Sequence, residues 1–165
     1  MRRTDKYRVL LVLAGLVLLH FSVRSRLGND RVAPDFLLLA LLIYTTRASP
    51  GKGAAAGFVV GLLRDALTPA SFGAGALAHT LVGYLSSWAK AVFFAENLFV
   101  NGCIFFAGTW IRNLAVALAS GQLKGGQLGW ELLVWSPLQS LTTALAGMFV
   151  LWLFGRWLAI RLSDA

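Results

Sequence analysis

Charged residues are scarce in this 165-residue chain: they make up 13% of it, against about 25% in a typical soluble domain, while hydrophobic residues make up 58%. The mean hydropathy is +0.70. No polar stretch is long enough to fold by itself, which argues against a soluble domain. We therefore expect an all-α integral membrane protein with a single transmembrane domain over residues 1–165.

Cysteine and histidine are also rare. The single cysteine, Cys103, excludes an intrachain disulfide and a cysteine cluster for a metal. The two histidines, His20 and His79, form no set with carboxylates at metal-ligand spacing. No serine, cysteine or carboxylate pair lies in a recognisable catalytic motif, and the glycines match no phosphate-binding loop. The sequence thus predicts no enzyme activity, no cofactor and no metal.

Negative charge is the scarcer sign, with 7 acidic against 15 basic residues and a net charge of +8. In a soluble protein this excess would suggest nucleic-acid binding. Here the basic residues mostly flank apolar runs, which indicates the positive-inside effect and attraction to anionic lipids. Nucleic acid is therefore not an expected partner.

Six helical segments can be drawn from the apolar runs. They cover residues 7–23, 35–46, 54–67, 73–94, 98–118 and 132–158. The first resembles a secretory signal but lacks a cleavage site, so we expect an uncleaved helix. The second is too short to cross a hydrocarbon core of ~30 Å at about 1.5 Å per residue, so it must be tilted, extended into the interface or buried among neighbours. Alternatively, the second and third segments form one re-entrant hairpin.

Six crossings place both termini on one side, and the basic residues select the cytoplasmic side. Nine basic residues fall on the inner side and six on the outer side. The inner set is Arg2, Arg3, Lys6, Arg8, Arg47, Lys52, Lys90, Arg156 and Arg161, and the outer set is Arg24, Arg26, Arg31, Arg64, Arg112 and Lys124. A re-entrant hairpin would leave the later loops on the same sides, so this count does not separate the two topologies.

Glycines recur every four residues in the third segment, at Gly53, Gly57 and Gly61, and so lie on one helix face. The fourth segment repeats the spacing with Gly75, His79 and Gly83. Such small-residue faces let two helices approach closely, which makes helix packing the leading interpretation. A glycine-lined substrate path is the alternative.

Arg64 and Asp65 interrupt the apolar third segment. Adjacent helical residues diverge by about 100°, so each needs a partner of its own. We expect Arg64 to reach the lipid headgroups and Asp65 to bond local backbone or a neighbouring helix. Arg112 and Asn113 lie inside the fifth segment, where a charge demands a partner, and we hypothesise an Asp65–Arg112 contact.

His79 lies on the glycine-containing face of the fourth segment. A proton relay or a solute ligand is one interpretation of an intramembrane histidine. A packing histidine that is hydrogen-bonded to a neighbouring helix is the expected one.

Two stretches together resemble the bacterial rod shape-determining MreD family: "PDFLLLALLIY" and "GKGAAAGFVVGLLRDALTPASFGAGALAHTLVGYLSSW". The shared features are a Pro-Asp before a short helix, a G-F-x-x-G-L-x-x-D segment, a break rich in proline and glycine, and a Gly-Tyr helix. Here these positions are Pro34, Asp35, Gly57, Phe58, Gly61, Leu62, Asp65, Gly73, Gly83 and Tyr84. The resemblance covers about residues 34–88.

The resemblance implies a non-enzymatic subunit of the cell-elongation machinery in the bacterial cytoplasmic (inner) membrane, which supports lateral-wall peptidoglycan synthesis. The implied partner is MreC, together with RodA, a class B penicillin-binding protein, the MreB filament and membrane lipids. The family's helix arrangement is also similar to the substrate-binding subunits of energy-coupling-factor vitamin transporters, which supplies the rival function. Those subunits dock through small residues four apart in the first helix, where this chain has only the adjacent Ala14 and Gly15.

Overall fold

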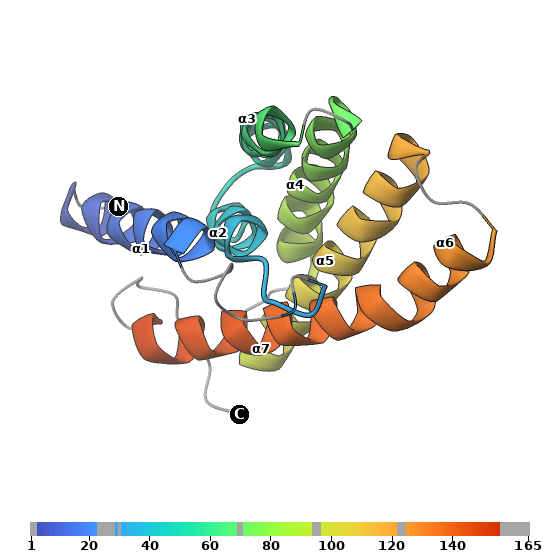
Figure 1. Cartoon of the computed structure of the whole chain (residues 1–165). Coiled ribbons are helices and arrows are strands. Elements are labelled where there is room, and N and C mark those ends of the chain that lie inside the picture. The colour runs from blue at the N-terminus through green and yellow to red at the C-terminus, as the bar shows by residue number, and fades with distance from the viewer. Residues whose placement is uncertain are drawn as a thin grey trace.

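The structure is a computed structural model that describes residues 3–22, 29, 31–68, 71–93, 97–121 and 125–155, and every regular element within these residues is helical (Figure 1). The helices are α1 (Arg3–Ser22), α2 (Phe36–Thr45), α3 (Pro50–Leu67), α4 (Ala74–Phe93), α5 (Leu98–Ser120) and a last helix composed of α6 (Gly126–Trp130), the π-helical turn η3 (Glu131–Trp135) and α7 (Ser136–Phe154). The all-α class expected from the sequence is confirmed for the described residues.

The short helix α2 lies at the centre of the bundle, in contact with α1, α3, α4, α5 and α7 (Figure 1). Eight of its ten residues are buried, as expected for a helix that is apolar on all sides. Of the three interpretations of a segment too short to span, burial among neighbouring helices is therefore the one observed.

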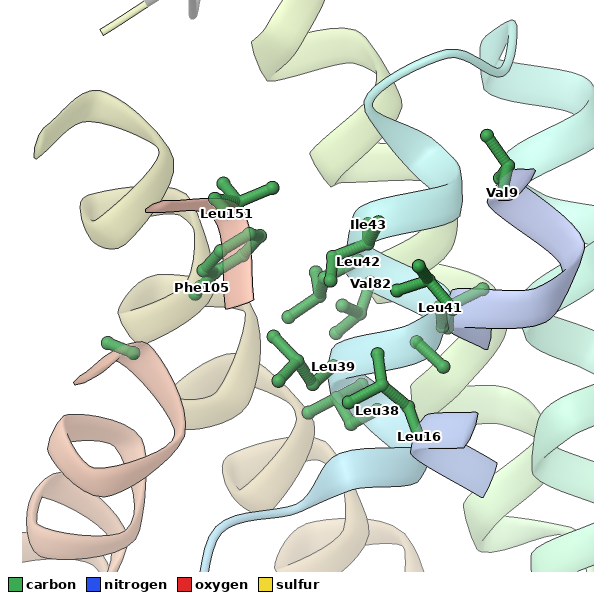
Figure 2. Packing of buried hydrophobic residues seen from close by; sticks show 13 residues of the cluster. Val9, Leu16, Leu38, Leu39, Leu41, Leu42, Ile43, Val82, Phe105 and Leu151 are labelled. Atoms are coloured by element: carbon green, nitrogen blue, oxygen red, sulfur yellow. The ribbon is translucent and has the colours of Figure 1, made fainter. Parts of the chain in front are cut away.

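The hydrophobic core is built around α2 (Figure 2). Leu38, Leu39 and Leu42 have no exposed surface, and α2 also contributes Leu41 and Ile43. The neighbouring helices contribute Val9, Leu16, Val82, Phe105 and Leu151. Full burial of an aliphatic side chain stabilises by about 1.5–3 kcal/mol, so this cluster fixes where α2 sits.

Helix α3 pairs with α4, and α5 pairs with α7 (Figure 1). Glycines allow the α5–α7 approach as well: a Cβ on Gly102 would lie 2.6 Å from Met148 Sδ, and a Cβ on Gly147 would lie 2.6 Å from Phe105 Cε2. A side chain at Gly147 would overlap the Phe105 ring, and one at Gly102 would require the flexible Met148 side chain to move. The sequence analysis identified the small-residue faces of the third and fourth segments but missed this pair.

Several helix boundaries differ from the predicted ones; α1, for example, begins at Arg3 instead of residue 7. Helix α3 begins at Pro50, because proline suits the first helical turn after Ser49. Helix α5 continues to Ser120 and ends at Gly121, whose φ of 61° is the left-handed conformation common after a helix. The last helix begins at Gly126 instead of 132. Pro69, the predicted breaker after the third segment, lies outside the described residues.

The last helix contains a π-helical turn immediately before Pro137, and it curves along its length (Figure 1). Proline donates no backbone hydrogen bond, which disturbs the regular ladder in the turn before it. The indole Nε1–H of Trp110 donates to the Leu132 carbonyl oxygen at 3.3 Å, and so ties this turn to α5.

Within the part of the chain that the structure describes, two helices are long and apolar enough to cross a membrane by length and composition: Leu98–Ser120 and Gly126–Phe154. Tyr7–Ser22 and Phe36–Thr45 are shorter apolar helices.

Candidate functional site

A buried carboxylate, that of Asp35, lies at the start of α2 with no exposed surface. Its Oδ1 accepts the backbone N–H of Leu38 at 3.1 Å, so Asp35 is the N-cap of α2. The Pro34–Asp35 pair thus begins the second helix as the sequence indicated. The carboxylate also has a second set of contacts, which the sequence did not reveal.

Two arginines from different helices converge on the other oxygen of this carboxylate. Arg64, in the last turn of α3, places Nη1 2.5 Å from Asp35 Oδ2. Arg112, in α5, donates from Nη2 to the same oxygen. The Arg112 side chain is only 7% exposed and that of Arg64 is 21% exposed, so both ion pairs are largely shielded from solvent.

Helices α1 and α7 also reach Asp35. The Asp35 backbone N–H donates to Thr143 Oγ1 of α7 at 3.1 Å. His20 Nδ1 of α1 lies 3.5 Å from Asp35 Oδ1 and accepts the Leu37 backbone N–H at 3.3 Å. We call this set the Asp35 cluster; its members are His20, Asp35, Arg64, Arg112 and Thr143.

Polar side chains extend the Asp35 cluster along α7. Asn113 Nδ2 donates to Gln139 Oε1 at 2.9 Å, and Gln139 Nε2 donates to the Ala33 carbonyl at 3.4 Å. Thr142 Oγ1 donates to the Val32 carbonyl at 2.6 Å. The segment before α2 is therefore held against the last helix, and Asn113 contributes to that contact.

This arrangement is suited to fixing helices in place. One carboxylate joins α2 to α3 and α5 through charge, and to α1 and α7 through neighbouring polar contacts. Removing one partner of a buried ion pair typically costs 3–5 kcal/mol, because the other charge stays buried. The Asp35 cluster therefore specifies the relative positions of five helices.

Asp65 caps the next helix. Its carboxylate accepts the backbone N–H groups of Gly73, Gly75 and Ala76, each at 2.9 Å. Gly73 has φ of 95°, a conformation that favours glycine in this turn. The start of a helix leaves unsatisfied N–H donors, and Asp65, from the end of α3, satisfies those of α4.

Among the described residues, Arg112 pairs with the carboxylate of Asp35, and the carboxylate of Asp65 accepts backbone N–H groups. The hypothesised Asp65–Arg112 contact is therefore wrong. The expected reach of Arg64 toward headgroups is also wrong, since its guanidinium turns inward to Asp35. The expectation that Arg64 and Asp65 need separate partners is confirmed. Both errors arose because Asp35 had been interpreted only as a helix start.

The glycine faces of α3 and α4 lie directly against each other. A Cβ on Gly57 would lie 2.6 Å from the His79 carbonyl carbon, and one on Gly61 would lie 2.5 Å from the Gly75 carbonyl oxygen. Gly53 meets Gly83 in the same way, at 3.1 Å from its carbonyl carbon. The two backbones are therefore in contact, and this geometry leaves no glycine-lined path between them.

His79 is fully buried, and its Nδ1 lies 2.7 Å from the Gly75 carbonyl oxygen one turn earlier. The predicted bond to a neighbouring helix is thus replaced by one within α4. Phe58 and Tyr84, the aromatic residues of the family-like motif, are 50% and 48% exposed. These two side chains lie on the outer surface of the bundle.

Sequence reasoning missed His20, Thr143 and Gln139, and it missed the role of Asp35 as a shared counter-ion. One signal in the sequence pointed to Asp35. Arg64 and Arg112 both lie in apolar segments, where each needs a counter-ion, and few acidic residues lie in or beside these segments. Among the described residues, no group of three or more His, Cys, Asp or Glu side chains lies close enough to hold a metal ion.

A family model described as "rod shape-determining protein MreD" matches residues 1–157 of the 165. The chain belongs to the MreD family. Searches of curated proteins and of solved structures gave no match. MreD is a membrane protein family that takes part in rod-shape determination, and it is a shape-determining component, not a known enzyme family.

The MreD assignment covers the Asp35 cluster as well as the glycine faces, since both lie within the matched residues. A largely buried polar cluster that joins five helices is consistent with a structural component of this kind. The site therefore supports a role in holding the helices of an MreD-family bundle in one arrangement.

Proposed function

We propose that the chain is a non-enzymatic membrane subunit of the bacterial cell-elongation complex, which binds MreC and supports lateral-wall peptidoglycan synthesis. The family match over residues 1–157 is the observation that carries this proposal. RodA, a class B penicillin-binding protein and MreB are further proposed partners. The chain acts by presenting helix surfaces to other membrane helices.

In the proposed topology the chain crosses the cytoplasmic membrane six times as one domain, with α2 as a short central crossing. The contacts support alternating helix directions. Asp35, at the start of α2, lies beside His20 near the end of α1 and pairs with Arg64 near the end of α3. Asp65 joins the end of α3 to the start of α4. We call this the Asp35 end of the bundle.

The charge distribution supports placing the opposite end in the cytoplasm. Arg64 and Arg112, counted on the outer side from the sequence, are buried against Asp35 and are not loop charges. Without them the outer loops retain four basic residues against nine on the inner side. The positive-inside rule counts charges in loops and near the membrane ends of helices, not charges paired inside the bundle, so the cytoplasmic placement of both termini gains support.

Helix α3 supplies a surface for partner helices or lipid. Its buried residues are Gly53, Gly57, Gly61 and Asp65, all of which face α4 or its cap. Large apolar side chains lie on an exposed face of the same helix: Phe58, Val59, Leu63 and Leu67 are each at least 46% exposed. In a membrane such a surface is suited to contact with another helix.

Co-purification tests the proposal. A tagged chain, expressed with MreC from the same genome and extracted in mild detergent, should retain MreC, whereas a tagged unrelated six-helix membrane protein should not. The same preparation is assayed for binding of a panel of vitamins. Tight vitamin binding without MreC would support the rival function of a transporter's substrate-binding subunit and overturn the proposal.

A further inference from the structure

An apolar groove lies between α4 and α5, with a volume of about 330 Å³. Its lining is almost entirely apolar and includes Leu85, Ala89, Phe99, Cys103, Ile104 and Ala107. Phe99 is 69% exposed and Cys103 is exposed, so the groove is open to the surroundings of the bundle. We call it the α4–α5 groove.

The groove lies toward the end of the bundle opposite Asp35. Ala89 is near the end of α4 and Phe99 is in the first turn of α5, whereas Asp65 caps the other end of α4. The groove therefore runs along the second half of α4 and the first half of α5.

Cationic residues gather at this same end, which we call the basic end. Arg47 lies in the turn from α2 to α3, Lys52 lies in the first turn of α3, and Lys90 lies in the last turn of α4. Gly53 packs on Gly83 and Ser87, which places the neighbouring Lys52 beside the end of α4. In the proposed topology the sequence assigns three acids, Asp5, Glu96 and Asp164, to this side of the membrane, against nine basic residues, so its net charge is positive.

We propose that the α4–α5 groove binds an acyl chain of an anionic phospholipid whose phosphate contacts Lys52 and Lys90 at the basic end. The apolar lining suits a hydrocarbon chain, and the hydroxyl of Ser86, which also lines the groove, already donates to the Val82 carbonyl oxygen at 2.7 Å. The cationic end attracts an anionic headgroup near the membrane surface. This inference rests on the membrane placement in the proposed function but not on MreC binding.

Cys103 provides the readout, because it lines the groove and is the single cysteine of the chain. The detergent-purified protein is titrated with phosphatidylglycerol or with phosphatidylcholine of the same acyl chains. The rate of Cys103 alkylation by N-ethylmaleimide is followed by intact mass, and bound lipid is counted by native mass spectrometry. Phosphatidylglycerol should slow alkylation at concentrations where phosphatidylcholine has little effect.

Two pairs of variants test the two parts of the site. Lys52→Gln with Lys90→Gln should weaken phosphatidylglycerol binding about tenfold or more, since each cation near an anionic surface contributes roughly fivefold. Arg31→Gln, at the other end of the bundle, is the matched control and should leave binding unchanged. Ala107→Phe fills the groove and should abolish lipid retention, whereas Ala119→Phe, exposed on the same helix outside the groove, should not.

Three outcomes overturn the lipid site: equal protection by both lipids, no effect of either lipid on alkylation, or protection of Cys103 only when MreC is bound. The last would assign the groove to a partner helix. MreC recovery is measured in parallel for the Lys52 and Lys90 double variant. If the double variant no longer prefers phosphatidylglycerol but still retains MreC, the lipid site is supported. If the wild-type chain itself fails to retain MreC, that result counts against the proposed function and not against the lipid site. A chain that stays soluble without detergent would contradict the membrane placement.

Discussion

Replacement of Asp35 by asparagine is the most informative perturbation of the bundle. The amide keeps an oxygen for the Leu38 N–H at the start of α2 but removes the charge that Arg64 and Arg112 share. Because Arg112 is only 7% exposed, its guanidinium cannot regain full hydration without moving α5. We therefore expect Asp35→Asn to destabilise the protein by about 3–5 kcal/mol.

The contributions can be separated by related variants. Asp35→Ala also loses the helix cap and should cost about 1 kcal/mol more than Asp35→Asn. Arg64 is more exposed than Arg112, so Arg64→Gln should cost less than Arg112→Gln. Glu131→Gln is the control: Glu131 is partly exposed and Arg31 is exposed, they lie 4.0 Å apart, and loss of this pair should cost at most about 1 kcal/mol.

The free energy of unfolding is measured by SDS titration in mixed micelles, with tryptophan fluorescence as the readout. In a double-mutant cycle, Asp35→Asn and Arg112→Gln together should cost about 1–3 kcal/mol less than the sum of the two single changes. If Asp35→Asn costs no more than Glu131→Gln, or if the cycle is additive, the Asp35 cluster does not hold the helices together.

Three further changes give expected losses by the same assay. Gly57→Leu should separate α3 from α4 and lower the free energy of unfolding by about 1–3 kcal/mol or more. Gly51→Ala is the control and should be neutral, because nothing lies within 4 Å of the added Cβ. Equal losses of stability in the two variants would refute the close backbone contact. Asp65→Ala should cost about 2 kcal/mol by uncapping α4, and retention of full stability would show that its three N–H contacts contribute nothing. Leu39→Ala should lower the free energy of unfolding by about 2–5 kcal/mol, because Leu39 is fully buried in α2. Leu133→Ala, at a 76% exposed position, is the control and should change stability little. A similarly small loss at Leu39 would show that the core does not lie around α2.

Much of the helical framework could be predicted from the sequence. The apolar runs located every main helix, and the four-residue glycine spacing identified the faces that bring α3 and α4 together. These features depend on local composition and periodicity, which one sequence displays directly. The boundaries at Pro50 and Gly126 were missed, because glycines and a proline at a helix start resemble a loop.

The centre of the bundle could not be predicted in the same way. The sequence allows the short second segment to be tilted, extended into the interface or buried among its neighbours. Burial depends on the five helices that pack around it, and one sequence does not display that packing. The partner of Arg112 was assigned to Asp65 because both were thought to lie toward the outer side. The actual choice depends on two competing demands: the N–H groups at the start of α4 occupy Asp65, which leaves Asp35 for the arginines.

Depletion of the chain in living cells tests the proposed function most directly. Cells that lose it should become round and stop incorporating a fluorescent cell-wall label along their side walls, and the wild-type chain should restore both. Uptake of vitamins should stay unchanged throughout. Cells that remain rods with normal side-wall labelling, but lose uptake of a vitamin, would contradict the account.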